Sequence, residues 1–269
     1  MRLLAVLPGL ALAACAPGVP AAQAATLAVK YRVDDQQTYR LHEVFTGALA
    51  GDSGQVQAVT FDLRAVEATR VTALEPDGTA TLLVQLIDLS GISNGQTLPP
   101  LGTQTYQVRM GPDGRVVGGG GGAAGGSTTS VPSADQDFAI LPDHPVKPGD
   151  SWTRDFERAN PFGTGSLKLH SENRLLRYEQ PGGVRAAVVH SRLRTPLDLD
   201  LKLATSGVLA HETGSVSAEV TSWLDPAAGR FVKTSSQTRF DLTGKMPYGT
   251  STYTYTLTGS QTVDLERTT

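Results

Sequence analysis

The chain has 269 residues, a formal net charge of −3 and a single cysteine, and at this length a core can be buried without disulfide bonds. Lysine and arginine are scattered along the sequence, which argues against a polybasic surface for nucleic acid or anionic lipid. The counts of 29 glycines and 16 prolines exceed the usual share of these residues, so we expect many turns.

The N-terminus has the plan of a secretory signal. Arg2 precedes an apolar segment, Leu3 to Ala14, that is too short to span a bilayer. The next residue is Cys15, and Leu12-Ala13-Ala14-Cys15 resembles the bacterial lipobox, in which the cysteine is acylated after cleavage. We therefore predict a signal peptide at 1–14 and an extracytoplasmic protein that acyl chains on Cys15 hold at a bacterial membrane.

A short tether is predicted at 15–26, because its Ala and Pro residues cannot form a core. It also contains Ala22-Gln23-Ala24, which fits an ordinary signal-peptidase site. Cleavage after Ala24 is the alternative to the lipid anchor and would leave a periplasmic or secreted protein.

A first β half is predicted at 27–117, where apolar residues recur at every second position. Leu27 to Val33 alternates in this way, and Val56 to Ala73 is a long candidate strand with one apolar face. Pro76-Asp77-Gly78 predicts a turn, after which Thr79 to Leu89 returns as the antiparallel partner. A second hairpin is predicted around Pro112-Asp113-Gly114.

A low-complexity run, Gly118 to Ser130, separates the halves, and we predict a flexible linker at 118–132. Its G-x-G-x-x-G matches are followed by Ser, Thr and Pro rather than by a helix, which argues against a phosphate-binding loop. Ser133 to Leu141 is a candidate short helix with Ser133 as its N-cap. The segment Leu141 to Trp152 contains three prolines, so we expect an extended path that packs against the body.

The second β half, 133–269, repeats the alternation, and Trp152 is expected to begin its first strand. Strand-like runs begin at Gly165, Val184, Gly214, Arg230 and Ser251. Turns are expected at Pro181-Gly182-Gly183 and at Asp225 to Gly229.

The two halves resemble each other. The twelve residues from Glu67 align with those from Glu172 so that the first Glu, the Pro and the last Gly coincide, and Gly114-Arg115-Val116-Val117 matches Gly229-Arg230-Phe231-Val232. An internal duplication would pack the halves as one domain with an approximate twofold relation. We predict an all-β fold in which duplicated antiparallel strands form a curved sheet, half-barrel or barrel-like shell, with at most one or two short helices.

The segment L-P-D-H-P-V-K-P-G-D-S-W at Leu141 to Trp152, with its flanking hairpins, resembles that of a class of uncharacterised bacterial extracytoplasmic lipoproteins with a signal and a β-rich body. The resemblance covers residues 27–266. At the level of the fold, the arrangement is also similar to the half-barrels of bacterial lipoprotein carriers, whose concave face shields acyl chains. This sequence lacks the helices that line that cavity, and a shared fold does not imply a shared function.

No catalytic constellation stands out. Gly51-Asp52-Ser53-Gly54 resembles the nucleophile loop of chymotrypsin-like proteases, but only His42 precedes it and the fragment also fits a hairpin turn. The five histidines are dispersed and form no zincin motif. Asp198 and Asp200 fit the wet face of a strand better than a calcium site.

Trp152 and Trp223 are the candidate ligand-contacting residues, with core packing as the alternative. We predict no catalytic residue, no cofactor, no metal and no nucleic-acid partner. The sequence favours an envelope-anchored, non-catalytic lipoprotein with a binding or structural role. The alternatives are a carrier for a lipid or other hydrophobic ligand, and a hydrolase with an unrecognised site.

Overall fold

A computed structural model describes residues 24–100, 102–120, 137–159, 163–164, 166–202, 209–248 and 250–268. The predicted signal peptide, Cys15 and most of the predicted tether and glycine-rich linker lie outside the described residues. No helix in these ranges is long and apolar enough to cross a membrane.

The predicted all-β class is confirmed, because the described chain forms one curved, antiparallel sheet of 13 strands. The first half contributes β1 (Gln36–Gly51), β2 (Val56–Leu74), β3 (Ala80–Ser93), β4 (Gln96–Thr97), β5 (Gln104–Met110) and β6 (Val116–Gly120). The second half contributes β7 (Ser151–Ala159), β8 (Gly163–Thr164), β9 (Ser166–Glu179), β10 (Ala186–Lys202), β11 (Leu209–Asp225), β12 (Arg230–Tyr248) and β13 (Ser251–Arg267). The one helical element in the described ranges is a 3₁₀ turn, Pro181–Gly183.

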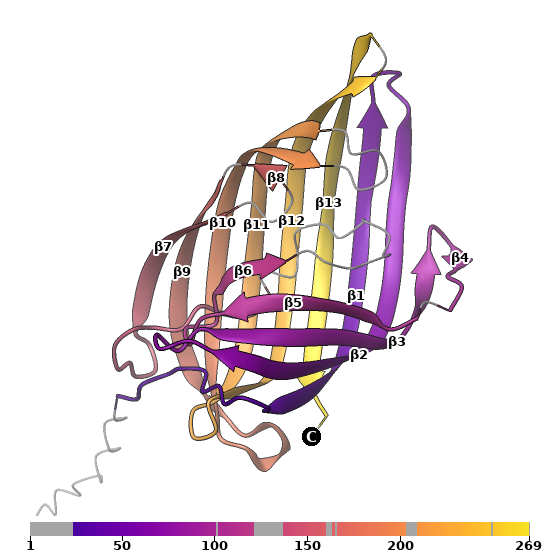
Figure 1. Ribbon diagram of the computed structural model, residues 1–269. Helices are drawn as coiled ribbons and strands as arrows, with labels where there is room; N and C mark the ends of the chain where they lie inside the picture. The colour runs from indigo at the N-terminus through magenta and orange to yellow at the C-terminus, as the bar shows by residue number, and fades with distance from the viewer. Residues whose placement is uncertain are drawn as a thin grey trace, which may run out of the picture.

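The sheet is open, and its main path runs β6-β5-β3-β2-β1-β13-β12-β11-β10-β9-β7. The first and last long strands join the two halves, since β1 pairs with β13 from Tyr39 opposite Arg267 to Gly51 opposite Tyr255. In Figure 1, β9 to β13 and β1 stand as a tall wall, and β2, β3 and β5 cross in front of its lower part. The edges β6 and β7 approach where the Arg115 guanidinium lies 5.3 Å from the centre of the Phe156 ring.

The bend that brings β2 and β3 across the front coincides with a bulge. The register between these strands shifts between Arg64 and Val66 and again between Val71 and Ala73. Extra residues of this kind bend a strand and increase its twist. The pairing of β2 with β1 continues without a shift from Val56 to Arg70, so inward and outward faces alternate regularly along this part of β2.

The predicted turns form hairpins. Gly78 and Gly114 have φ angles of 85° and 82°, in the left-handed region that glycine adopts at little cost. Pro181–Gly183 joins β9 to β10, and Asp225 accepts the amides of Ala227 and Ala228 at the turn into β12. Local turn chemistry therefore fixes where the chain reverses.

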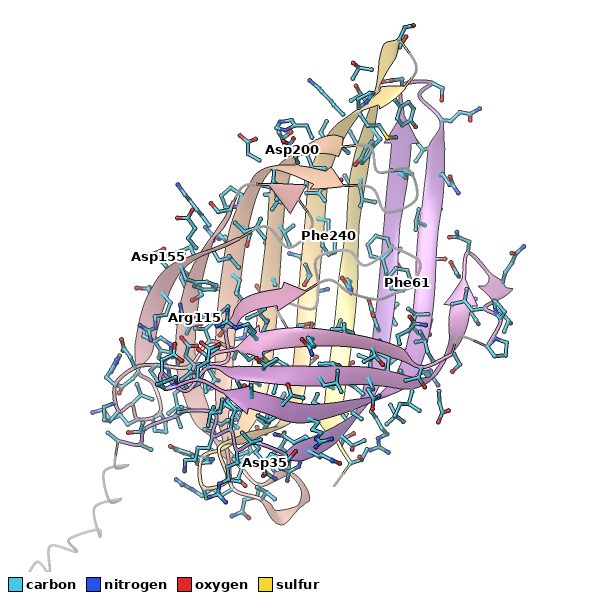
Figure 2. All side chains as sticks on the ribbon, in the orientation of Figure 1. Asp35, Phe61, Arg115, Asp155, Asp200 and Phe240 are labelled. Atoms are coloured by element: carbon cyan, nitrogen blue, oxygen red, sulfur yellow. The ribbon has the colours of Figure 1, made fainter. Side chains whose placement is uncertain are left out.

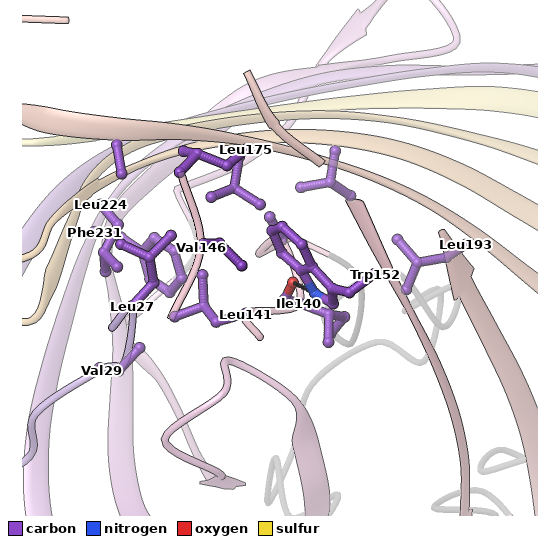
Figure 3. Packing of buried hydrophobic residues seen from close by; sticks show 14 of the residues in the cluster. Leu27, Val29, Ile140, Leu141, Val146, Trp152, Leu175, Leu193, Leu224 and Phe231 are labelled. Carbon is purple, nitrogen blue, oxygen red and sulfur yellow. Dashed lines mark hydrogen bonds between the residues drawn. The ribbon is translucent and has the colours of Figure 1, made fainter. Parts of the chain in front are cut away.

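The segment from Asp137 to Val146, here called the seam segment, packs against the inner face of the sheet, although its residues 143–145 are exposed. Ile140, Leu141 and Val146 are buried with Trp152 at the start of β7, and Figure 3 shows these side chains packed together. The predicted packing of Leu141 to Trp152 is confirmed at these positions. The predicted helix over 133–141 is wrong for residues 137–141, which are not helical. The reason is a tertiary contact, because the Ala139 and Ile140 amides donate to side chains of β11 and β10 rather than to carbonyls of their own segment.

Two predicted boundaries need correction. Leu27 and Val29 are buried as their alternation predicts, but residues 27–33 form no strand. Instead, the Val29 and Lys30 amides donate to the carbonyls of Pro112 and Gly229, so this segment ties two turns together. The predicted linker began at residue 118, whereas β6 extends to Gly120.

The order of hairpins agrees with a duplication. In both halves, each successive long strand of the chain is added on the same side of the strand before it in the sheet. The ungapped alignment, however, does not match strand faces. Glu67 faces the interior with Ala65 and Val71, whereas Glu172 is exposed between the buried residues Ser171 and Asn173. A slip of one residue reverses the face of a strand, and bulges interrupt β2 and β9 at different aligned positions. The duplication itself stays a prediction.

Candidate functional site

A cavity of about 70 Å³ lies in the lower interior, between the first-half strands and the seam segment. Five aromatic side chains line it: Tyr31, Tyr39, Tyr106, Phe138 and Phe231. Aliphatic side chains from β2, β3, β5 and β6 complete the wall, including Val71, Leu82 and Met110. The cavity is therefore built from both halves of the chain and from the seam segment.

Glu67 is the acidic residue at the centre of this wall. It lies on β2 opposite Tyr39 of β1, and the alternation that buries Ala65 and Val71 turns its side chain inward. The side chain lines the cavity and is partly exposed. Burial raises its pKa from 4.5 to about 7, because a low-dielectric environment disfavours the charged form. Within the described chain no side chain or amide bonds to it.

Two other carboxyls line the same cavity, and both have partners. Asp35 forms an ion pair with Arg230 at 2.8 Å, and Figure 2 labels Asp35 at the lower end of the molecule. Asp137 accepts a hydrogen bond from the Ser236 hydroxyl at 3.2 Å. No lysine, arginine or histidine is among the described residues that line the cavity. The titratable side chains among the described lining residues are therefore carboxyls and tyrosines.

The tyrosines at the cavity are held neutral. Burial is the main reason that the pKa values of Tyr31 and Tyr39 lie well above their ordinary value. The Tyr39 hydroxyl donates to the Gln37 side-chain oxygen and lies 3.2 Å from the Phe231 carbonyl oxygen. Phe138 and Phe231 stack with ring centres 4.7 Å apart. These contacts fix the orientation of the rings around the cavity.

Two further glutamates face the interior higher in the sheet, and both are hydrogen-bonded. Glu43 on β1 accepts from the Gln261 amide of β13, and Glu212 on β11 accepts from the Tyr255 hydroxyl. Burial raises the pKa of each carboxyl, and the hydrogen bond partly offsets that rise. Both carboxyls are already committed to a partner on a neighbouring strand, in contrast to Glu67.

The structure does not assemble a protease site. Ser53 lies in the turn between β1 and β2, whereas His42 lies on β1 beside Asp62, at 3.0 Å. Ser53 follows His42 by eleven positions, and the part of β1 from His42 to Gly51 alone spans about 30 Å at about 3.3 Å per residue. Gly54 has a φ of 71°, as the alternative interpretation of this fragment as a hairpin turn requires.

The remaining histidines are outward-facing or exposed, and each has a local partner. His144 and His170 bond to Asp143 and Asp155, and His190 bonds to the Thr221 hydroxyl at 3.2 Å. His211 lies 3.1 Å from Asp200 and 3.5 Å from Asp198, which places this aspartate pair on the wet face of β10. No group of metal-ligating side chains occurs in the described ranges.

The two tryptophans occupy different environments. Trp152 is buried in the core, where its indole N–H donates to the Ile140 carbonyl at 3.1 Å (Figure 3). Trp223 lies on the outer face of β11, where its N–H donates to Glu179 at 2.6 Å and Lys233 lies over the ring. Neither residue lines the Glu67 cavity. Asp150 accepts the Lys147 amide at 2.9 Å in a local turn.

A wider groove of about 630 Å³ lies outside the sheet, at the bulge of β2. Its charged side chains are mixed in sign and include Arg40, Arg64, Lys233, Asp264 and Glu266. Arg40 pairs with Glu266 at 3.1 Å, and both are more than half exposed. Charges that already neutralise each other in water offer little net attraction to a ligand.

A comparison of the chain with protein families and with curated proteins gives no match. Sequence reasoning missed Glu67 as a site residue and treated it only as the first position of a repeat. A signal was present, since Val59, Phe61 and Leu63 mark the apolar face of β2 and Glu67 occupies the same face four positions after Leu63. An acidic residue on that face is unexpected unless it has a role.

Proposed function

We propose that this protein is an envelope-anchored, non-catalytic lipoprotein with a binding role. The lipobox-like sequence Leu12 to Cys15 supports the anchor, and Cys15 is the only cysteine of the chain. The observation that carries the binding role is the interior cavity, because Glu67 on its wall is only partly exposed and no described group bonds to it, whereas polar groups withdrawn from water are nearly always hydrogen-bonded. The scattered, locally paired histidines support a role without catalysis.

The anchor is tested by acyl labelling in a bacterial host. The wild-type chain should incorporate a radiolabelled fatty acid and fractionate with membranes, and the Cys15→Ser variant should lose both properties. A Cys15→Ser chain that still takes up label would contradict the proposal. Release of an unlabelled wild-type chain that begins at Ala25 would instead identify the ordinary signal-peptidase site.

A carrier of hydrophobic ligands is the second candidate. The upper interior favours it, because Phe45, Phe61 and Phe240 form an apolar cluster on the inner face of the sheet, where Figure 2 shows Phe61 and Phe240. The dense packing of the seam segment in the lower interior favours the binding or structural role. Lipid extraction and native mass spectrometry of protein from its own host separate the two candidates. Co-purified lipid at one molecule per chain supports the carrier, and lipid-free protein argues against it.

A further inference from the structure

We propose that the Glu67 cavity binds a small organic ammonium group, such as a primary or methylated amine. This inference deepens the proposed binding role and rests on it. It identifies the chemical class that the cavity takes, with Glu67 as the counter-charge and the surrounding rings as the walls.

The charge of the cavity is the first argument. Three carboxyls line the cavity. No basic side chain is among the described residues that line it. Arg230 compensates Asp35, and the Ser236 hydroxyl bonds to Asp137, whereas no described group forms an ion pair or a hydrogen bond with Glu67. A buried carboxylate is strongly destabilised unless a cation or hydrogen-bond donors approach it. An anionic ligand would worsen this imbalance, and a neutral apolar ligand would not relieve it.

The aromatic lining is the second argument. Tyr31, Tyr39, Tyr106, Phe138 and Phe231 bound the same space as Glu67. The negative face of an aromatic ring attracts organic cations, and the attraction is stronger in sites that exclude water. A hydrated metal ion needs several oxygen or nitrogen ligands at short distance, and no such group occurs in the described part of the chain. Rings and one carboxylate together suit an alkylammonium better than a metal.

The size of the cavity limits the ligand. A volume of about 70 Å³ is roughly half that of an engineered 150 Å³ cavity that admits benzene in another protein. The space therefore accepts a head group of a few non-hydrogen atoms and excludes an acyl chain. Gln37 and Thr69 on the cavity wall are partly exposed, which gives the head group a way in from their side.

Binding should depend on pH, because protonation of Glu67 removes the counter-charge. With a pKa of about 7, the apparent affinity should be roughly 30-fold weaker at pH 5.5 than at pH 8. The other titratable groups around the cavity are Asp35, Asp137, Tyr31, Tyr39 and Tyr106. Two arginines lie nearby: Arg230 forms an ion pair with Asp35, and Arg267 lies opposite Tyr39 in the sheet. Asp113 is also near Tyr31 and pairs with Arg115. The tyrosines whose shift is resolved have raised pKa values, so they stay neutral across this range.

The test measures the thermal unfolding midpoint of the purified full chain against methylammonium chloride at pH 8 and constant ionic strength. A ligand that binds the folded state raises the midpoint, and at ten times the dissociation constant we expect a rise of about 3 °C. Methanol serves as the neutral isostere and should give no saturable rise. The same titration at pH 5.5 should need a much higher concentration.

The Glu67→Gln variant keeps the shape of the side chain and should lose at least tenfold in affinity. Glu266→Gln removes an exposed carboxylate outside the cavity and should bind as the wild type does. An equal rise in Glu67→Gln, or a rise that potassium chloride reproduces, would overturn the ammonium site. A chain that fails this titration but is acylated at Cys15 leaves the proposed anchor intact, and an unacylated chain that binds methylammonium leaves the site intact.

Discussion

The two sides of the lower interior differ in whether the polar groups discussed below have hydrogen-bond partners. On the side of β10 and β11, the Ala139 and Ile140 amides donate to the hydroxyls of Ser222 and Ser191, at 2.9 and 3.0 Å. On the side of β2, Glu67 faces a cavity and no described group bonds to it. The first side has the dense packing of a stable core, and the amides that the seam segment turns toward it are hydrogen-bonded.

One side therefore stabilises the fold, and the other is the candidate binding region. The two regions are neighbours in the lower interior. The seam segment contributes to both, because Leu141 packs in the dense cluster and Phe138 lines the cavity. A protein that retains a cavity and an unpaired, partly buried carboxyl loses stability there. That loss is expected where a site is preserved for a ligand.

The largest effect is expected from the dense side. Leu141→Ala removes a fully buried side chain and should lower the free energy of unfolding by about 3 to 5 kcal/mol. Urea unfolding followed by tryptophan fluorescence measures this value. Leu74→Ala is the matched control, because Leu74 is 43% exposed and should change stability far less. Similar losses at the two positions would show that the seam segment does not stabilise the interior.

Glu67→Gln should act in the opposite direction at neutral and alkaline pH. Below pH 4.5 the carboxyl is neutral in both states, so the variant and the wild type should have similar stability. As the pH rises from 4.5 to about 7, the unfolded chain loses its proton first, and the wild type therefore becomes progressively less stable. Above pH 7 the penalty reaches its full value of about 3 kcal/mol, and the Gln variant lacks it.

Urea unfolding of both chains at pH 4.5, 6 and 8 measures this difference. Glu266→Gln serves as the control, because Glu266 is exposed and pairs with Arg40 on the outer face. A wild type that is more stable than Glu67→Gln at pH 8 would indicate that the carboxylate already has a partner, and would count against the contrast between the two sides.

The smallest effect is expected at the seam hydrogen bonds. Ser222→Ala removes the acceptor of the Ala139 amide and the partner of the Thr234 hydroxyl, which leaves a buried donor unsatisfied. The free energy of unfolding should fall by about 1 to 3 kcal/mol. Ser217→Ala on the exposed face of the same strand should stay within about 0.5 kcal/mol of the wild type. Equal losses in the free energy of unfolding for the two serine variants would show that these hydrogen bonds do not stabilise the dense side.

Sequence reasoning predicted the strands and turns well because they depend on neighbouring residues. The alternation in Val56 to Ala73 became β2, and Pro76-Asp77-Gly78 became the turn into β3. It failed where a distant contact decides the outcome. Residues 137–141 have helix-compatible side chains, but Ser191 and Ser222 hold their amides in an extended path. Trp152 was identified as a possible core residue and is one, whereas Glu67, which lines the candidate site, was treated only as a position in the repeat.

The sequence by itself determined the β class, the position of most reversals and the inward face of each long strand, because these follow from side-chain alternation and from the local conformations of glycine and proline. Only the tertiary structure decided that β1 pairs with β13, that the seam segment fills the interior and that Glu67 meets five rings in one cavity. These features join residues far apart in the chain, and they depend on the register and bulges of strands, which a local pattern does not specify.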